Sequence, residues 1–425
     1  MKILFKNFKE SIKKFDLFGL GNSAVLYYLL IFYLTPTLVF LGVSFRLMPA
    51  DYHIDHPVMV YLTTGLVCLV LGYMIPWPIK IARKIPNFFK QDWDFTKVPW
   101  VLLAVFLGGL AIKIIRIWAG GYFHLVQNPA FITSSFYSLI GLLNWLSYLA
   151  LVISFIGYFR LKKIGDHRFI YWRWLAYGLL TFEICYGLPT CSALSVIIPI
   201  MLYLIVRSYL VKIEYWRIML GLMIIILFLF PFSRLCRQTP YQMPIDLQDY
   251  ATVSNYSLVS SSFLNRIDQS FIFSKIVKNP EPLSFWHGKS LVDFFVTLGP
   301  PRFIWKDKPL SLNAYGNDFG HRLGVLNPDD VQTSIGPTIV GDWYLNFGIL
   351  GIILGMFWIG MVFRVIYEYF IKETKTSLSG VLFYSMIWIQ VIWGMEDWTS
   401  SVYAGLIKLS VIILIVNFFL IKRRS

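Results

Sequence analysis

The 425-residue chain is 57% hydrophobic and 18% aromatic, and only 14% of its residues are charged. This composition excludes a set of soluble domains and predicts an all-α polytopic membrane protein. The net charge of +15 is typical of some nucleic-acid-binding proteins, but the basic residues are spread over separate short connections. We therefore interpret the charge as a topology signal and expect no nucleic acid as a partner.

Ten apolar stretches are long enough to cross a hydrocarbon core of about 30 Å, which takes roughly 20 helical residues. The first follows a basic, amphipathic start, MKILFKNFKESIKKF, and lacks the small-residue cleavage site of a secretory signal. It is therefore expected to remain as the first span. The predicted spans are residues 22–45, 57–76, 98–118, 132–158, 170–187, 190–209, 216–232, 338–362, 378–394 and 401–421.

Lysine and arginine cluster in both tails and in every second connection, as the positive-inside rule requires of a chain with both termini in the cytoplasm. The connection between the seventh and eighth spans is the only long one and falls on the external side. The chain thus divides into spans one to seven over 1–232, a large extracytoplasmic loop over 233–337, and spans eight to ten over 338–425.

The large loop carries too many aromatic and aliphatic residues for a disordered segment, so we expect it to fold. Residues 254–280 have the pattern of an amphipathic helix that lies on the outer surface and ends before Pro280. The remainder, punctuated by Gly, Pro, Asn and Asp, is expected to be ordered loop with short helices.

Neither the four cysteines nor the histidines have the spacing of a metal site, so we expect no metal and no cofactor. Packing in apolar surroundings is the usual role for such cysteines. The topology also permits a disulfide between Cys191 and Cys236, because both fall near the outer face.

The ionisable residues inside the predicted spans gather near the outer ends. Each has a simple explanation, either snorkelling to the interface or a structural pair such as Glu183 with Lys113 or Lys408. Together, beneath one loop, they indicate a polar cavity that opens to the outside and suits an anionic lipid head group such as a diphosphate. These residues are Lys113, Arg116, Glu183, Asp342 and Lys408, with Glu396 and Asp397 in the turn before the last span.

Two stretches of the loop add candidate site residues. PPRFIWKDKP, residues 300–309, holds Arg302, Lys306 and Lys308 on a segment that prolines stiffen, which limits the entropy lost when the cations bind a ligand. NAYGNDFGHRLG, residues 313–324, contains His321, a candidate general base with charged neighbours, for which a surface role is the alternative. Aromatic residues such as Trp305 and Tyr344 could stack on sugar rings, although an interfacial aromatic belt also predicts them.

Two elements of the sequence are similar to elements of the oligosaccharide repeat-unit polymerases of bacterial surface polysaccharides, the O-antigen polymerase (Wzy-type) family. A PR-x-x-W-x-x-KP element is met within residues 301–309, and a G-E/D-x-Y-x-N-F-G-x-x-G element is met within residues 341–351. The sequence also departs from the family. LPTCSALS, residues 188–195, lacks an arginine that many relatives carry near the outer end of a middle span, and the RX10G pattern counted from Arg302 meets Asn313.

The resemblance implies a metal-independent glycosyltransferase of the membrane-embedded GT-C type in the bacterial inner membrane. It would transfer glycan from one polyprenyl diphosphate to a second lipid-linked repeat unit at the outer face, with membrane lipid, a chain-length regulator and a flippase as partners. Arg302, His321 and Asp342 are the candidate catalytic residues. The candidates for binding diphosphate or glycan are Lys113, Arg116, Arg237, Arg266, Lys306, Lys308, Arg322, Trp305 and Tyr344.

Three other functions stay open at the level of sequence. A ligase-like glycosyltransferase would use the same chemistry with a different acceptor, and a transporter would move polysaccharide or lipid-linked sugar without lengthening it. A scaffold of an envelope complex would not need the cationic residues at all.

Overall fold

The computed structural model describes residues 16–41, 54–86, 88–118, 137–190, 192–211, 218, 221, 268–278, 287–300, 304–305, 307–309, 316–326, 334–372 and 377–422. Over these residues the chain is helical, and its only β-type pairing is an isolated bridge between Trp93 and Ile421. The all-α class predicted from composition is confirmed.

Eight helical segments are long and apolar enough to cross a membrane, which confirms a polytopic membrane protein. They contain α2 (Leu20–Phe40), α3 (His56–Met74), α5 (Val98–Trp118), α8 (Trp145–Ile164), α10 (Ala193–Leu210), α16 (Thr338–Tyr367), α17 (Leu378–Trp393) and α18 (Thr399–Leu420). The predicted span 170–187 corresponds to α9 (Phe169–Gly187), which is less apolar because it carries Arg173 and Glu183. The predicted span 216–232 lies outside the described residues, apart from positions 218 and 221.

The fourth predicted span, 132–158, is shifted in the structure. A short helix, α7 (Tyr137–Leu143), precedes α8, and α8 continues to Ile164. It ends there because Gly165 adopts a left-handed conformation with φ of 75°, the usual C-terminal cap, behind Lys162 and Lys163 in the last turn. The basic residues that suggested an earlier end thus belong to the helix.

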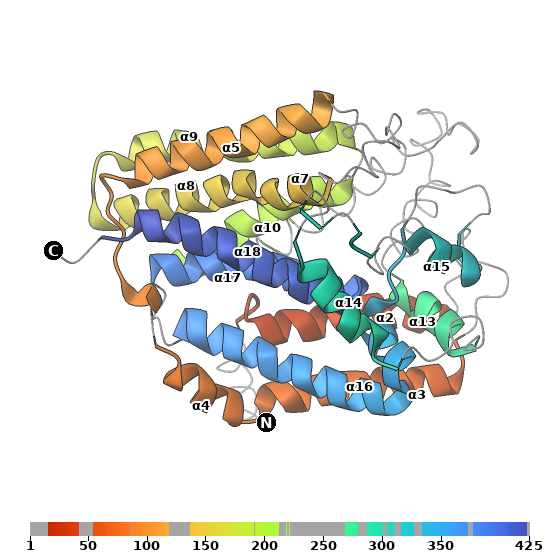
Figure 1. Ribbon diagram of the computed structural model, residues 1–425. Coiled ribbons are helices and arrows are strands. Elements are labelled where there is room, and N and C mark those ends of the chain that lie inside the picture. The colour runs from red at the N-terminus through yellow and green to blue at the C-terminus, as the bar shows by residue number, and fades with distance from the viewer. Residues whose placement is uncertain are drawn as a thin grey trace.

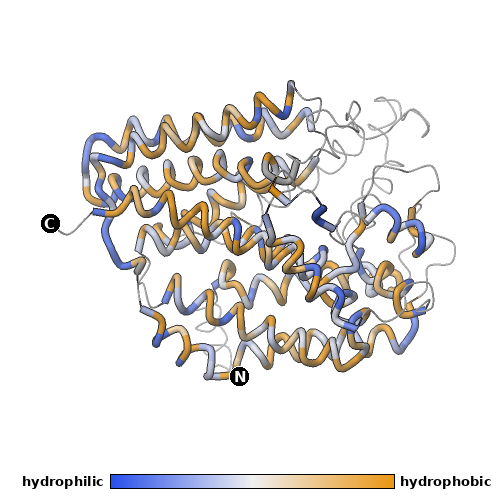
Figure 2. Tube along the Cα trace, viewed as in Figure 1, coloured by the Kyte–Doolittle hydropathy of each residue, from blue (hydrophilic) through white to orange (hydrophobic). Residues whose placement is uncertain are grey.

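The spans run alternately in opposite directions and create two unlike ends (Figure 1). We call one the basic end, because it carries the α8–α9 connection, the short helix α4 (Trp77–Lys84) and the chain after α18. The opposite end, here the loop end, carries α13 (Gln269–Lys278) and α15 (Gly316–Arg322). Figure 2 shows apolar residues along the helices between the two ends and hydrophilic residues concentrated at them.

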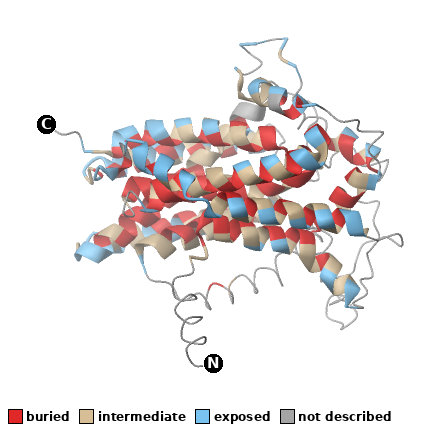
Figure 3. Cartoon of the chain, turned by 90° about the horizontal axis from the view of Figure 1, so that it is seen from below, coloured by how far each residue is buried: buried red, intermediate tan, exposed pale blue. Residues whose placement is uncertain are grey.

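Helix α17 forms the centre of the bundle. All of its residues are buried except Gln390 and Trp393, which are partly exposed, and it packs on α2, α8, α10 and α18. Figure 3 shows that buried residues gather in the middle of the bundle. Its polar atoms bond to neighbouring segments: Tyr384 donates to the Phe18 carbonyl at 2.6 Å, and Trp388 Nε1 donates to Ser23 at 3.0 Å. A helix that is apolar on every side is typical of such a central position.

Helices α3 and α16 pack at backbone distance along much of their length. A Cβ atom on Gly72 would lie 2.0 Å from the carbonyl oxygen of Phe357, and one on Gly360 would lie 2.2 Å from that of Leu69. Small residues at helix crossings allow this close approach in membranes, where van der Waals packing drives association.

The amphipathic helix predicted over 254–280 is described only from residue 268, where α13 follows. α13 buries Phe273 and Ile276 against α2, α3 and α16, and Lys278 forms a 3.1 Å ion pair with Asp55 at the start of α3. This part of the loop is therefore folded, as predicted, and covers the loop end of the bundle.

Candidate functional site

The sequence element of residues 341–351 forms a break in α16. Phe347 and Gly348 leave the helical conformation, and Gly348 has φ of 62° and ψ of −146°, a region that residues with a Cβ atom rarely adopt. The break separates a short first segment, residues 338–346, from the long span that follows.

Two further glycines of this region make room for Trp343 of the first segment. A Cβ atom on Gly351 would lie 2.1 Å from the Trp343 carbonyl oxygen, and one on Gly355 would lie 2.1 Å from the Trp343 ring. The Gly351-xxx-Gly355 pattern thus serves intramolecular packing, the more common role for such a pair. The glycines of the element shape the backbone.

The aspartate of the element, Asp342, is buried and bonded on both carboxylate oxygens. Oδ2 accepts a hydrogen bond from the Thr399 backbone N–H at 3.0 Å, and Oδ1 accepts from Asn346 Nδ2 at 3.1 Å. Asn346 also bonds to Ser290 of α14 (Lys289–Leu298). Asp342 and Asn346 therefore join the first segment of α16 to the N-terminal ends of α18 and α14.

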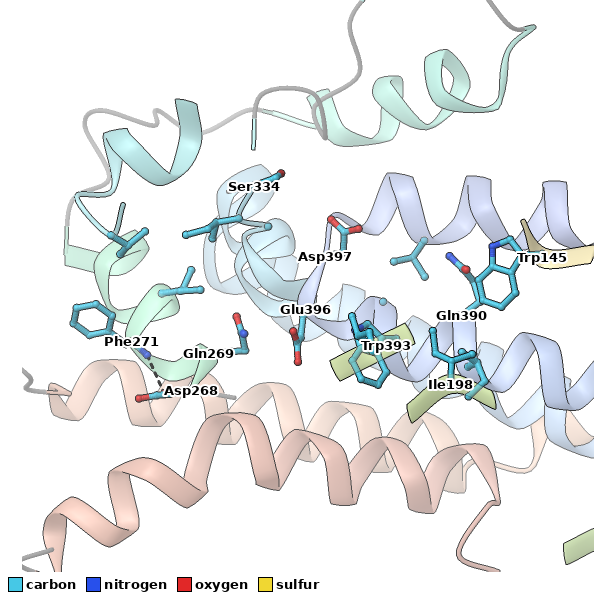
Figure 4. Close-up of a pocket in the computed structure, with 18 residues that line it drawn as sticks. Trp145, Ile198, Asp268, Gln269, Phe271, Ser334, Gln390, Trp393, Glu396 and Asp397 are labelled. Atoms are coloured by element: carbon cyan, nitrogen blue, oxygen red, sulfur yellow. Dashed lines mark hydrogen bonds between the residues drawn. The ribbon is translucent and has the colours of Figure 1, made fainter. Parts of the chain in front are cut away.

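Beside this junction lies a cavity of about 720 Å³ at the loop end (Figure 4). Its polar walls come from α13 and from the turn between α17 and α18, and two tryptophans line it from α8 and α17. The lining residues are Trp145, Leu194, Ile198, Asp268, Gln269, Phe271, Ile272, Val325, Ser334, Ile335, Gly336, Ile389, Gln390, Trp393, Gly394, Glu396, Asp397 and Val402. The cavity is acidic, since the described residues that line it include three carboxylates and no lysine or arginine.

The three carboxylates differ in their hydrogen bonds. Asp268 caps α13, because Oδ1 accepts from the Ser270 backbone N–H at 3.0 Å. Glu396 Oε1 accepts a hydrogen bond from the Tyr27 hydroxyl of α2. Asp397 Oδ1 accepts from the Trp398 backbone N–H at 2.7 Å, at the start of α18. These bonds hold all three side chains at the cavity wall.

Asp397 has the electrostatic property expected of a proton acceptor near neutral pH. Burial is the main cause that raises the pKa of its carboxyl to about 6; the hydrogen bond from the Trp398 N–H opposes this shift, and the neighbouring Asp342 and Glu396 carboxylates contribute to it. A carboxyl with this pKa is mostly ionised at pH 7 and still able to accept a proton.

Lys113 lies outside this cavity in a buried ion pair. Its Nζ is 2.9 Å from Glu183 Oε2, the side chains are 2% and 3% exposed, and Nζ lies 3.7 Å from the centre of the Tyr186 ring. The sequence alternative that paired Glu183 with Lys113 is confirmed. Arg116 follows one turn later on α5. The pair neutralises Lys113 and ties α5 to α9.

His321 and Arg322 lie in the last turn of α15 and do not line the cavity. Arg322 forms an ion pair with Asp318 of the same helix at 2.8 Å. The α15 helix is held against α18 by an edge-to-face contact between Phe319 and Trp398, whose ring centres are 5.2 Å apart. His321 is thus only four residues from Val325, which lines the cavity, but is not itself a lining residue.

Lys308, Trp305 and Tyr344 are also separate from the cavity. Lys308 Nζ donates to the carbonyls of Gly299 and Pro300, both at 3.0 Å, and Trp305 is partly exposed beside it. Tyr344 packs between Tyr61 of α3 and Phe273 of α13. Four other predicted site residues, Arg237, Arg266, Arg302 and Lys306, lie outside the described residues, as do Cys191 and Cys236.

Several cavity residues were absent from the predicted site. The sequence places Glu396 and Asp397 with the ionisable residues of a polar cavity, but not among the candidate catalytic or binding residues. Asp268, Gln269, Gln390, Trp145 and Trp393 are not among the sequence candidates at all. They come from distant parts of the chain, and a lone tryptophan or glutamine in apolar sequence carries no local signal. The one usable signal was the adjacent Glu396–Asp397 pair between two spans.

The fold and the cavity define a polytopic helical membrane protein with a polar, tryptophan-lined site at one end of its bundle. Residues 323–415 match the family model described as putative O-antigen polymerase. The match includes the 341–351 element and ends before the last turns of α18, and it confirms the family resemblance. It supports a general role in polysaccharide polymerisation. The comparisons with curated proteins and with solved structures find no match.

Proposed function

We propose that this protein is the polymerase of a bacterial surface polysaccharide and transfers glycan from a polyprenyl diphosphate onto a lipid-linked repeat unit at the outer face of the inner membrane. The supporting observation is that most residues lining the cavity, including Glu396 and Asp397, belong to the stretch 323–415 that matches the polymerase family. The loop end would then face outward, as the positive-inside rule predicts.

The cavity suits the acceptor sugar. Tryptophan rings such as Trp145 and Trp393 pack on the apolar faces of sugar rings, and carboxylate and amide groups such as Glu396, Gln269 and Gln390 bond to hydroxyls. Its volume of about 720 Å³ falls within the range of about 300 to 1,000 Å³ that is common for ligand sites.

In the proposed reaction an acceptor hydroxyl attacks the anomeric carbon of the donor glycan. A new carbon–oxygen glycosidic bond forms, the bond between the anomeric carbon and the diphosphate oxygen breaks, and the diphosphate leaves with the electron pair. The hydroxyl proton passes to a carboxylate of the protein. Because diphosphate is already a good leaving group, alignment and charge stabilisation are the main tasks of the site.

We assign the proton acceptor to Asp397, which lines the cavity. Asp342 was predicted for this role, but its two oxygens accept bonds from Thr399 and Asn346 inside the protein. His321 does not line the cavity. The diphosphate remains assigned, on sequence grounds, to Arg302 and Lys306, because the Lys308 ammonium donates to the carbonyls of Gly299 and Pro300. The Lys113–Glu183 ion pair receives a structural role instead.

The test is complementation of a strain that lacks the gene. The unmodified protein should restore a ladder of glycan lengths, whereas Asp397→Asn should leave single repeat units and reduce turnover about 100-fold or more. Asp94→Asn, at the basic end, is the matched control and should restore the full ladder. A full ladder from Asp397→Asn would contradict the assignment.

The same strain separates the alternative functions. Intact polymer that accumulates on its lipid carrier would indicate a ligase. Purified protein in vesicles should lengthen added lipid-linked repeat units; transport of those units across the vesicle without lengthening would indicate a transporter.

A further inference from the structure

Helix α14 has its polar and apolar faces reversed with respect to a helix on a water-facing surface. Its buried residues include Ser290 and Asp293, whereas Val292 is 64% exposed and Phe295 is 70% exposed. A helix at an aqueous surface buries its apolar face and exposes its polar one. The outward face of α14 therefore has the composition of a surface that contacts hydrocarbon.

Three contacts fix α14 beside spans of the bundle and show its direction. Near its start, the Ser290 N–H donates to Asn346 in the first segment of α16 at 3.3 Å. In its middle, Ser400 of α18 donates to Asp293 at 2.7 Å, and at its last turn Lys408 of α18 donates to the Thr297 carbonyl. Since α18 runs from the loop end to the basic end, α14 runs inward alongside it (Figure 1).

The contact with Lys408 shows that the end of α14 lies alongside α18, below the first residues of that span. Lys408 follows Thr399, the first residue of α18, by nine positions, which corresponds to about 13 Å along the helix axis at 1.5 Å per residue. Over the same depth α18 itself exposes Ile407 and Val411, as expected of a span that faces lipid.

Backbone carbonyl groups at the end of α14 have hydrogen-bond partners within the protein, as a hydrocarbon environment requires. The last carbonyls of a helix lack partners inside the helix, and in a bilayer no water replaces those partners. Here the Lys408 ammonium bonds the carbonyl of Thr297, and the Lys308 ammonium bonds those of Gly299 and Pro300. Cations at this position also stabilise the helix dipole.

The chain then turns back toward the loop end. The Trp305 ring packs close to Gly299, and the Lys308 N–H donates to the Trp305 carbonyl at 3.2 Å, so Trp305 and Lys308 lie against the end of α14. The next described helix, α15, is again at the loop end, where the Gly316 carbonyl accepts a bond from Ile335.

From these contacts we propose that α14 and the turn after it form a re-entrant membrane segment, which enters the bilayer from the loop end, contacts lipid hydrocarbon through Val292 and Phe295, and returns to the same side. The proposal does not depend on the polymerase function. It would place part of the predicted extracytoplasmic loop, residues 233–337, within the membrane.

Spin labels on single cysteines test the environment of the exposed face. Phe295→Cys and Val292→Cys, made in a chain whose native cysteines are replaced by serine, would be labelled and reconstituted in bilayers. Collisions with oxygen, which concentrates in hydrocarbon, and with a water-soluble nickel chelate would be measured by electron paramagnetic resonance. Val411→Cys on α18 is the control for lipid, and Asp318→Cys on α15, a half-exposed polar position, is the control for water.

We expect both α14 labels to match the Val411 label, with oxygen collisions dominant and nickel collisions several-fold below those of the Asp318 label. Nickel collisions as frequent as at Asp318 would place the face in water and overturn the proposal. Low collision rates with both reagents would show that protein covers the face, which would overturn it equally. Two exposed positions are labelled, so if one variant fails to fold, the other still shows whether the face contacts lipid.

Discussion

The acid–base behaviour of the proposed site depends on one residue, Asp397. Because burial raises the pKa of this carboxyl to about 6, its ionised form should decline as the pH falls through 6. Chain extension by purified protein should therefore rise with pH up to about 6 to 7 and then level off. Asp397→Glu should keep this dependence and Asp397→Asn should lose it, which a pH profile of turnover would show. An unchanged profile in Asp397→Asn would assign the acid limb to another group.

The same pKa links Asp397 to stability with a defined sign. The folded state holds the proton up to about pH 6, whereas the unfolded chain releases it near the ordinary value of 3.8. Between these values the folded state binds more protons, so this residue's contribution to the free energy of unfolding falls as the pH rises. Asp397 therefore contributes less to stability near neutral pH, where we expect it to act, than it does at acidic pH.

Lys113 and Glu183 provide a second prediction at the level of residues. Lys113→Ala leaves a buried carboxylate without its partner and should cost about 3 to 5 kcal/mol, whereas the double change Lys113→Leu with Glu183→Leu should recover most of that loss. Thermal unfolding in detergent measures both. If Lys113→Ala instead abolished chain extension at unchanged stability, the ammonium would have the phosphate-binding role that the sequence suggested.

Among single residues, the sequence identified charges more readily than their roles. It located Lys113, Glu183, Asp342 and Asp397 because charge in an apolar sequence is conspicuous and costly. It could not distinguish a carboxylate bonded on both oxygens, such as Asp342, from one that lines a cavity, such as Asp397, since that depends on contacts between distant segments.

At the scale of elements, the break in α16 depends on Gly348. Alanine there would be forced into a backbone region that disfavours a Cβ atom, at a cost of about 1 to 3 kcal/mol. Gly348→Ala should lower the unfolding temperature, and it should disturb the junction of Asp342 with Thr399. Gly178→Ala, in the middle of α9 with open space around it, is the control and should be neutral or slightly stabilising. Equal effects from the two changes would argue against a special role for the break.

Hydropathy predicted most elements because a helix that crosses lipid needs about 20 apolar residues, and a run of that length is visible in the sequence itself. The end of α8 at Gly165 was missed, since its last turn is basic. The break in α16 was missed because glycines in a span usually indicate helix packing, and Gly351 and Gly355 do serve packing. Short helices were predicted in this part of the loop without bounds, and the ten residues of α14 are too few for the sequence to indicate a segment within the membrane.

At the scale of the whole molecule, the predicted orientation can be measured. A cysteine at position 318, at the loop end, should react with an impermeant reagent in intact cells. A cysteine at position 84, in α4 at the basic end, should react only after permeabilisation. Both positions are exposed, so accessibility to the reagent depends on the side of the membrane. The opposite pattern would invert the topology.

The overall layout follows from sequence more fully than the cavity does. Alternating basic connections predicted antiparallel spans with unlike ends, and the described helices have that arrangement. The cavity instead combines Trp145 of α8, Gln269 of α13 and Asp397 beside α18, which no local pattern links. Only tertiary packing brings them together.

The central position of α17 has a consequence for biogenesis. This helix follows α2, α8 and α10 in the chain, yet it fills the middle of the bundle and is almost wholly enclosed by these helices and by α18. Its 16 residues extend about 24 Å, less than the hydrocarbon thickness, which a helix shielded from lipid can tolerate. Because α2, α8 and α10 are synthesised before α17, the centre of the bundle can pack only after these spans have been made.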